Sequence, residues 1–290
     1  YYDLTDERSA HINKLKGDLH TVFPQYLDVF CDVTGKTSTM ILRQYGTPDK
    51  ILRGHKKTMI EKISKASRKG LAKASERYEK LCAAANAAKT FGCQIDSIYF
   101  NIFLTLDLVE KLDSALDSIL NRIRQLITFN KNEKFIQQIK LLNTIPGVGF
   151  LTAVTIMCEI GDFSAFRNPK QLFAYFGLDP EVNESGKFVG TQLHMSKRGS
   201  RIARRAIFAV ALASIRTKRN GEGINPYLRK YYELKSGQKP KMVAIGAVMH
   251  KVCNIVFAVL RDEKAFELRS PEEHCKPVSY THLRAHETEL

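Results

Sequence analysis

Apolar residues recur at helical spacing along most of this chain and divide it into amphipathic segments. Residues 4–19 alternate polar and apolar positions in this way, and the pattern ends at Pro24 because proline cannot continue a helix. Residues 241–260 are apolar on most faces, which predicts a helix that forms core. No run of Val, Ile and Thr at strand spacing dominates in any segment. The fold class is therefore predicted to be mainly α.

A longer repeat covers residues 104–126, where apolar positions step by fours and threes. Polar residues such as Asp107, Lys111 and Arg122 lie outside this seam. The seam positions are Leu108, Leu112, Ala115, Ile119, Ile123 and Leu126. Because about three heptads is the shortest repeat that specifies a coiled coil, two interpretations stay open. The segment forms either a coiled coil between chains or a helical pair packed within its own chain.

Two glycines one residue apart link two helical patterns in residues 141–153, in the order Leu-Leu-Asn-Thr-Ile-Pro-Gly-Val-Gly. This order is typical of a helix-hairpin-helix turn. In such a turn Gly147 and Gly149 would let backbone N–H groups approach a phosphate at the start of the following helix. A tight interhelical loop without a ligand explains the same residues, so both interpretations stay open.

One serine stands shortly before a dense group of cations. Gly186 follows Ser185, which favours a turn that leaves the serine hydroxyl exposed. Phe188, Val189 and Leu193 predict a short ribbon between this serine and the next helix. The cations beyond it, suited to gripping the phosphates of a nucleic-acid strand, are Lys197, Arg198, Arg201, Arg204 and Arg205. An ordinary Ser-Gly turn without chemistry is the alternative.

The distribution of charge narrows the class of partner. The 290 residues carry a formal net charge of +15, and 44% of them are apolar, which excludes a wholly disordered chain. Residues 185–241 alone hold fourteen Lys and Arg against two acids, a net charge of +12. A surplus so concentrated favours nucleic-acid contact over general solubility. Residues 53–80 hold ten Lys and Arg against three acids. There, a solvated helix face and a nucleic-acid contact are both open.

Cysteine spacing and hydropathy argue against two other classes of protein. Six cysteines are scattered without a C-x-x-C pair, so neither a zinc site nor a disulfide framework is expected. The sequence shows no unbroken apolar run of transmembrane length, so we expect no membrane partner. The thiols are expected to be reduced and the protein cytoplasmic.

The two ends of the sequence differ from those expected of a complete natural protein. It starts at Tyr1 without Met or a signal-peptide pattern, so we expect it to begin inside a longer protein. Residues 277–290 resemble the translation of a sequencing-library adapter and are set aside from fold reasoning. The metal-like spacing of His282, His286 and Glu287 falls in that segment, so no metal ligand is assigned.

The order of motifs resembles a known family. The series runs Leu142-Asn-Thr-Ile-Pro-Gly-Val-Gly, Ile160-Gly-Asp with Phe166, Gln171-Leu-Phe-Ala-Tyr-Phe-Gly-Leu-Asp-Pro, Ser185-Gly-Lys, Ser196-Lys-Arg-Gly-Ser-Arg and Lys239-Pro-Lys-Met-Val-Ala. It resembles the C-terminal domain of the insertion-sequence transposases of group one hundred and ten, which are bridge-RNA-guided recombinases. The resemblance covers about residues 1–265; the ordered series in the C-terminal part is specific and the N-terminal match is loose.

This resemblance implies a serine recombination reaction on DNA, with Ser185 as nucleophile. Its implied partners are DNA, a structured guide RNA and further copies of the chain. An N-terminal RuvC-like domain would hold Mg²⁺ through an Asp-Glu-Asp-Asp quartet expected upstream of Tyr1. Asp3 and Asp6 do not occupy the quartet's positions, so this fragment is expected to bind no metal and to be inactive alone. The expected nucleic-acid contacts are Gly147, Gly149, Lys187, Ser196, Lys197, Arg198, Ser200, Arg201, Arg204 and Arg205.

The expected organisation has four parts. Residues 1–55 are predicted as the helical tail of a truncated RuvC-like domain and 56–140 as a basic helix and coiled-coil region. Residues 141–268 are predicted as a compact helical transposase domain with a helix-hairpin-helix-like turn and a short β-ribbon, and 269–290 as a disordered tail. Two functions remain open: a transposase fragment that uses Ser185, and a helix-hairpin-helix nucleic-acid scaffold without chemistry.

Overall fold

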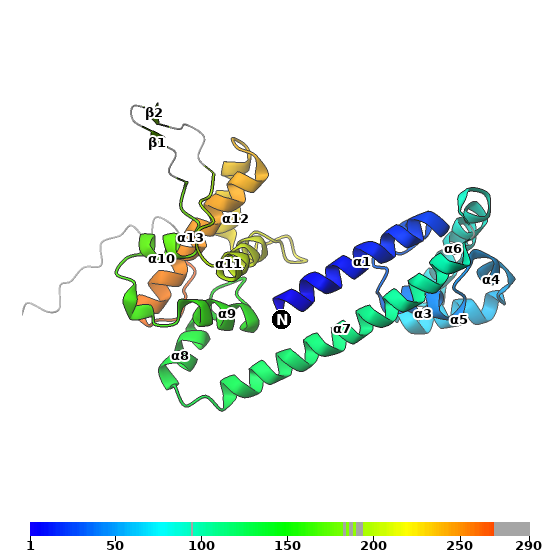
Figure 1. Cartoon of the computed structure of the whole chain (residues 1–290), viewed down its shortest axis with the longest axis horizontal. Helices are drawn as coiled ribbons and strands as arrows, with labels where there is room; N and C mark the ends of the chain where they lie inside the picture. Colours follow the sequence, from blue (N-terminus) through cyan, green and yellow to red (C-terminus); the bar gives the residue numbers. More distant parts are fainter. Residues whose placement is uncertain (94, 182–183, 186–187, 190–193, 270–290) are drawn as a thin grey trace, which may run out of the picture. The chain divides into compact units, whose positions relative to one another are not determined.

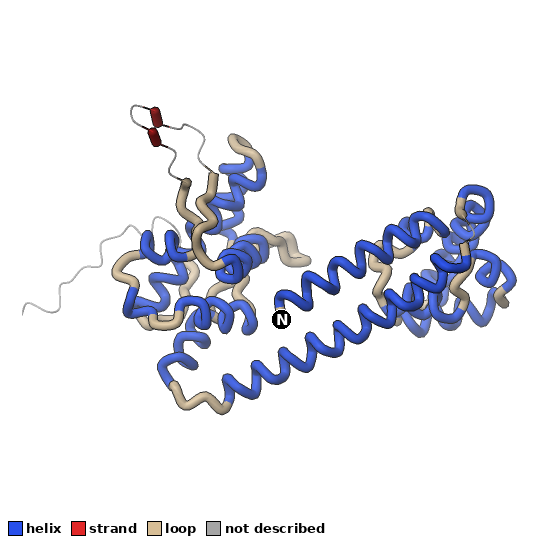
Figure 2. The backbone as a smooth tube through the Cα atoms, viewed as in Figure 1, coloured by secondary structure: helices blue, strands red, loops and turns tan. Residues whose placement is uncertain are grey.

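A computed structural model of the chain describes residues 1–269 except 94, 182–183, 186–187 and 190–193. It is mainly α-helical, as predicted, with a single two-stranded ribbon in the described part (Figures 1 and 2). The chain forms two compact units, Tyr1–Thr128 and Phe129–Leu290. The domain boundary predicted after residue 55 therefore falls inside the first unit, and the boundary predicted after residue 140 falls inside the second. The predicted tail beyond residue 269 lies outside the described residues.

The first unit consists of two long helices and a small helical lobe inserted between them. Its helices are α1 Tyr2–Val22, α2 Tyr26–Val29, α3 Lys36–Gln44, α4 Pro48–Arg53, α5 Lys56–Ser67, α6 Leu71–Phe91 and α7 Asp96–Thr128. Helices α1 and α7 lie side by side and run antiparallel (Figure 1). Arg8 near the start of α1 pairs with Asp113 far along α7, and Tyr99 near the start of α7 donates to the carbonyl of Val22 at 3.4 Å. The predicted helix over residues 4–19 is confirmed.

The antiparallel pairing corrects the seam that the sequence predicted on α7. The side chains buried on this helix include Ile102, Leu106, Val109 and Leu116, whereas Leu108 and Leu126 of the predicted seam are 43% and 55% exposed. At 3.6 residues per turn, Leu108 and Leu126 lie about a third of a turn from the buried stripe. The other four predicted seam positions, Leu112, Ala115, Ile119 and Ile123, are half-buried. Packing against α1 is therefore centred on a stripe offset from the predicted heptad, and Leu108 and Leu126 remain exposed.

The lobe between α1 and α7 has an aromatic core. Phe23, Tyr26 and Phe30 pack in sequence, with ring centroids 5.1 and 4.9 Å apart. The hydroxyl of Tyr26 is buried and lies 2.9 Å from that of Ser38, and burial raises the pKa of this phenol. Pro24 ends α1 as predicted. The turn that follows brings α2 into contact with α6 and places Tyr26 in the core of the lobe.

The second unit surrounds one apolar helix. Its elements are α8 Glu133–Leu142, α9 Phe150–Ile160, the 3₁₀ turn Phe163–Ala165, α10 Pro169–Tyr175, β1 Glu184–Ser185, β2 Phe188–Val189, α11 Arg201–Ser214, α12 Pro226–Ser236 and α13 Lys241–Asp262. Helix α13 contacts α8, α10, α11 and α12, which confirms the predicted core helix. By length and composition alone α13 could cross a membrane, a possibility that the sequence prediction had set aside. Its side chains, including Val248, Val252 and Val256, are buried within this unit.

The exposed stripe on α7 generates a test of self-association. Replacing Leu108 and Leu126 by Asp should separate protomers held by this stripe, because charge would be placed in an apolar contact. Neither change should disturb the intrachain pair with α1. Light scattering would measure the mass, and the control replaces Asn121 and Gln125, which are exposed polar positions of α7, by Asp. A monomeric parent chain, or an unchanged mass, would assign α7 to intrachain packing alone.

Candidate nucleic-acid interface

Ser185 lies near the tip of a β-hairpin that rises from the second unit. In this hairpin β1 pairs antiparallel with β2, with Ser185 opposite Phe188. The predicted ribbon is therefore present, but Ser185 is part of it instead of preceding it. Gly186 and Lys187, which connect the two strands, and Leu193 lie outside the described residues. The prediction of a turn at Gly186 and of a phosphate contact at Lys187 thus stays a prediction.

The stem of this hairpin is held by a short ladder of hydrogen bonds. Pro180 and Met195 form a bridge, and Glu181 donates its N–H to the carbonyl of His194 at 2.7 Å. Ser196 adds two bonds to Asp179: its N–H donates to the Asp179 carbonyl at 2.8 Å, and its hydroxyl donates to the carboxylate at 2.6 Å. A hydroxyl bonded to an ionised carboxylate is a strong partner. Ser196, predicted to contact phosphate, therefore fastens the two strands of the stem.

Close backbone packing fixes the stem to the rest of the unit. Gly177 has φ +66°, a conformation that L side chains rarely adopt. A Cβ on Gly199 would overlap the carbonyl oxygen of Tyr175, so only glycine fits there. Arg204 crosses this junction and donates to the carbonyls of Phe176 and Gly199, each at 3.1 Å. Arg204 is half-buried. It satisfies two carbonyls at the base of the hairpin through Nη1, and the phosphate contact predicted for it stays a prediction.

Ser200 has a similar structural use. Its hydroxyl oxygen accepts the N–H of Ala203 at 3.0 Å, which caps α11, and the hydroxyl donates to the carboxylate of Glu159 on α9. Tyr175 donates to the Glu159 carbonyl at 3.1 Å. Glu159, Tyr175 and Asp179 thus hold the hairpin and α11 in place. Tyr175 and Asp179 belong to the motif that begins at Gln171, but no role was expected for either, and Glu159 lies just before the motif Ile160-Gly-Asp.

Exposed cations gather where the stem meets α11. Lys197 and Arg198 precede this helix and are exposed, and Arg201 is its first residue and also exposed. Arg205 is half-buried on the next turn. The Glu159 carboxylate, bonded to the cap residue Ser200, lies at the same helix start and offsets part of the positive charge there. Lys197, Arg198 and Arg201, called the α11 cations below, outnumber it, and the charge of such an exposed group suits a phosphate backbone.

A second basic loop follows α11 at its other end. The N–H of Ile224 donates to the Arg216 carbonyl at 2.8 Å, and that of Lys218 to the Glu222 carbonyl at 2.7 Å, which folds residues 216–224 into a tight turn. Arg216, Lys218 and Arg219 are exposed on it. Lys218 lies 3.8 Å from the carboxylate of Glu222. Helix α11 has fourteen residues, so about 20 Å separates the basic groups at its two ends.

The predicted helix-hairpin-helix turn joins α8 to α9. Gly147 has φ +98°, and a Cβ there would lie 2.7 Å from the hydroxyl oxygen of Ser214 on α11. Ser214 in turn donates to the carbonyl of Pro146 at 3.0 Å. Close packing against α11 therefore explains why residue 147 is glycine. Gly149 differs, because it is exposed, has φ −93° and precedes the first turn of α9 with open space around it. Phosphate contact at either glycine stays a prediction.

Two thiols in the described part of the second unit, Cys158 and Cys253, are poor competitors of Ser185 as nucleophiles. Cys253 is fully buried in the core, and burial raises the pKa of its thiol to about 12. Burial and the neighbouring Glu159 carboxylate raise the pKa of the Cys158 thiol. Cysteine reacts as the thiolate, so both groups stay protonated and unreactive at neutral pH. Within the described part of the chain, no three His, Cys, Asp or Glu side chains group as metal ligands would.

Comparison with known proteins relates this unit to one family. Residues 139–233, from the end of α8 into α12, match the family described as Transposase IS116/IS110/IS902 family. An insertion element IS110 protein of 43.6 kDa from Streptomyces coelicolor is 24% identical over 272 residues, covering 93% of this chain and 63% of that protein. The pilin gene-inverting protein of Moraxella bovis is 30% identical over 177 residues, covering 61% of this chain and 52% of that protein.

A third relative is the transposase for insertion sequence element IS1111A of Coxiella burnetii, 26% identical over 188 residues, which are 63% of this chain and 50% of that protein. The chain thus spans between half and just under two thirds of the length of these three relatives. The resemblance predicted from the motif series is confirmed. The matched region contains the hairpin, the α11 cations and the α8–α9 turn.

The junction at Gly199 generates a test of how the hairpin is held. Gly199→Ala should destabilise the second unit by about 1 to 3 kcal/mol, because the new methyl group meets backbone that cannot move aside cheaply. Gly149→Ala is the matched control: its φ is negative and its surroundings are open, so the expected change is within about 0.5 kcal/mol. Thermal unfolding would measure both. Equal stability of the two variants would show that the stem does not depend on this contact.

Proposed function

We propose that this chain is part of a DNA transposase or recombinase in which Ser185 attacks the DNA backbone. The observation that carries the proposal is the hairpin: it presents Ser185 from a stem fixed beside the α11 cations, inside the region that matches the transposase family. The relatives named as transposase and as pilin gene-inverting protein support a reaction that moves or inverts DNA segments. The predicted cytoplasmic location is proposed with it, because that is where cellular DNA is reached in a bacterium.

The proposed step is a transesterification at phosphorus. The Ser185 hydroxyl gives up its proton to a base, and its oxygen forms a bond to phosphorus as the bond from phosphorus to one deoxyribose oxygen breaks. That oxygen takes up a proton and leaves as a hydroxyl. The hydroxyl of a second strand then attacks the same phosphorus. The bond from phosphorus to the Ser185 oxygen breaks, the serine takes back a proton, and the exchanged strands are joined. The energy of the phosphodiester is kept in the serine ester, so no outside energy source is needed.

The α11 cations have two uses in this step. They neutralise phosphates on either side of the attacked one, which places the strand, and they favour the extra negative charge that develops at phosphorus. Arg204, Ser196 and Ser200 act differently, because their polar atoms are engaged within the protein. We assign them to holding the hairpin in position. Their loss should therefore reduce strand exchange through geometry more than through affinity for DNA.

The resemblance also implies a Mg²⁺ ion, which when bound would stabilise charge on the attacked phosphate. The described residues of this chain bring no such group of carboxylates together. We propose that the Mg²⁺ ion is held by a segment of the complete protein outside this chain. A structured guide RNA and further copies of the chain are proposed as partners on the same resemblance. RNA would compete with DNA for the basic surface of the second unit.

A binding scaffold without chemistry is the second candidate. The observation that favours it is the open backbone at Gly149, where the first N–H groups of α9 are free of a side-chain cap. Such a helix start can hold a phosphate. The two candidates share the same partner and differ only in whether a covalent bond forms.

Salt dependence tests the basic surface. The chain should bind duplex DNA with an affinity that falls steeply from low to physiological salt, and each phosphate contact should add about 0.9 to the log–log slope. Replacing Lys197 and Arg198 by Gln should reduce this slope by about 1 to 2. The matched control replaces Lys131 and Lys134, which are exposed at the start of α8, by Gln as well. A flat salt dependence would remove residues 185–241 as the contact surface.

The chemistry is tested in the full-length protein that contains this chain. Ser185→Ala should leave the fold and DNA affinity unchanged, because it removes one hydroxyl and no charge, and should abolish strand exchange. Trapped protein–DNA adducts would be mapped by peptide mass spectrometry. Ser196→Ala is the comparison, expected to weaken exchange partly and to lower the melting temperature through the lost bond to Asp179. Normal exchange by Ser185→Ala, or an adduct on another residue, would remove Ser185 as the nucleophile. The absence of both an adduct and strand exchange in the unchanged protein would leave the scaffold as the function.

A further inference from the structure

The first unit carries a concentrated positive surface that the serine chemistry does not use. Residues 62–73, at the turn between α5 and α6, contain five cations and no acid. We call this group the α5–α6 tip; its members are Lys62, Lys65, Arg68, Lys69 and Lys73. The acids that follow on α6 are already paired, Glu76 with Lys80 at 2.8 Å and Glu79 with Lys56 at 2.6 Å. The charge of the tip is therefore not neutralised by these neighbouring carboxylates.

The tip borders a concave site with converging cations. A cavity of about 230 Å³ lies between α2, α5 and α6, and its lining includes Lys69, Lys73, Arg77 and Lys80. Arg77 is held there with its guanidinium 5.6 Å from the ring of Phe30. Two carboxylates also line the cavity, Glu76, which pairs with Lys80, and Asp28. With four cations against two acids, the lining of the cavity keeps a net positive charge.

The backbone that carries these cations is well anchored. Met59 and Ile63 on α5, and Ala74 and Leu81 on α6, are buried in the lobe core. In the connecting turn the Ser64 hydroxyl donates to the Lys69 carbonyl at 2.7 Å. The cations are thus displayed on a preformed surface, so that binding need not order the backbone that carries them.

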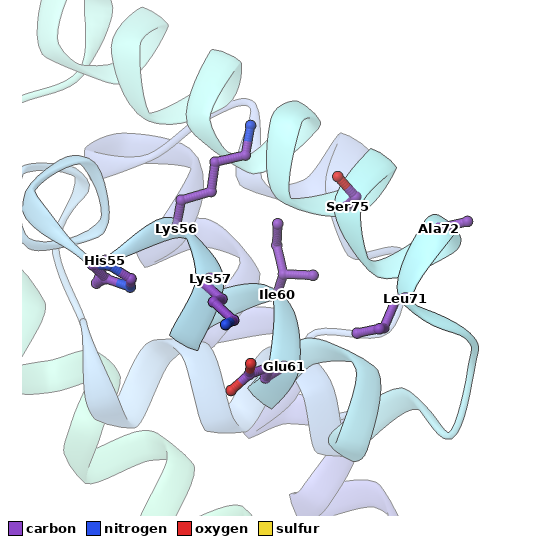
Figure 3. Close-up of a pocket in the computed structure, with 8 residues that line it drawn as sticks. All are labelled: His55, Lys56, Lys57, Ile60, Glu61, Leu71, Ala72 and Ser75. Carbon is purple, nitrogen blue, oxygen red and sulfur yellow. The ribbon is translucent and has the colours of Figure 1, made fainter.

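The other side of the same helical hairpin is different in character. A larger cavity of about 710 Å³ is lined by Ile60, Leu71 and Ala72 together with the charged or polar His55, Lys56, Lys57, Glu61 and Ser75 (Figure 3). Leu71 is 60% exposed and extends toward α5. Nothing in the structure identifies what would cover this apolar surface. The charge pattern of the α5–α6 tip, in contrast, specifies the chemistry of its partner.

We propose that the α5–α6 tip binds the phosphate backbone of duplex DNA, as a second contact apart from the DNA held by the second unit. This inference rests on the proposed function for its choice of DNA. Four of the five tip cations are lysines, which bind phosphates as point charges without the bidentate geometry that reads bases. Residues 62–73 contain no aromatic residue, and the Tyr45 ring beside the tip is already in contact with Lys62, whose Nζ lies 5.6 Å from its centroid. Single-stranded nucleic acid is bound mainly by stacking on aromatic side chains, so a duplex backbone suits this surface better.

A charge-matched pair of variants tests the proposal in the whole chain. One variant replaces Lys65, Lys69 and Lys73 by Gln. The control replaces Lys14, Lys16 and Lys36 by Gln; these are exposed lysines of the same unit, away from the tip. Both lose three charges, so any difference between them reports position. Circular dichroism and thermal unfolding would confirm that both remain folded.

The measurement is the salt dependence of binding to a labelled DNA duplex, with an RNA duplex of the same sequence as the second probe. The tip variant should lose about 2 to 3 from the log–log slope on DNA, and the control variant less than about 1. Equal slopes for the two variants would overturn the proposal, and so would a loss on the RNA duplex alone, which would assign the tip to RNA. Strand exchange by Ser185→Ala decides the proposed function separately, because that result does not depend on the tip.

Discussion

The close approach of two backbone segments at Gly177 and Gly199 is the constraint on which the second unit's candidate site depends. A side chain on Gly199 would overlap the Tyr175 carbonyl, and Gly177 takes a positive φ at the same junction. Because the segments touch, the hairpin stem and the start of α11 form one body. Ser185 is carried on that hairpin and the α11 cations stand at its base. The stem and the start of α11 are therefore held together by backbone contact, beside the surface that we propose binds phosphates.

Polar contacts around this junction explain residues that would otherwise be assigned to ligand binding. The hydroxyls of Ser196 and Ser200 reach Asp179 and Glu159, and Arg204 satisfies two backbone carbonyls. A buried or half-buried polar group without a partner costs free energy, so such groups are used first to satisfy the fold. Lys197 and Arg198 lie outside this network and are exposed. Within one short motif the structure thus separates residues that hold the fold together from residues that are exposed to solvent.

The two units share a positive charge but organise it differently. In the second unit the cations lie at the ends of α11 and beside a hairpin with a candidate nucleophile. In the first unit they lie at the α5–α6 tip, without a neighbouring group that could do chemistry on DNA. Contacts to phosphates position a nucleic acid without reading its sequence. The two proposals together divide the work: the first unit would contribute affinity, and the second unit would contribute both affinity and reaction.

The sequence by itself determined the mainly helical class, because apolar spacing and proline stops act locally: α1 ends before Pro24 and α13 covers the predicted core helix. The motif series was also enough to find the resemblance to a transposase family, which the match over residues 139–233 supports. Only the tertiary structure decided which stripe of α7 packs on α1 and why Gly147 must be glycine. The same holds for the partners Glu159 and Asp179 of the two serines. The reason is physical. Helical propensity and periodicity depend on residues that are neighbours in sequence. The carboxylate that bonds Ser200 lies 41 residues away in the chain, and packing in three dimensions selects it, as packing also selects which face of α7 is covered by α1.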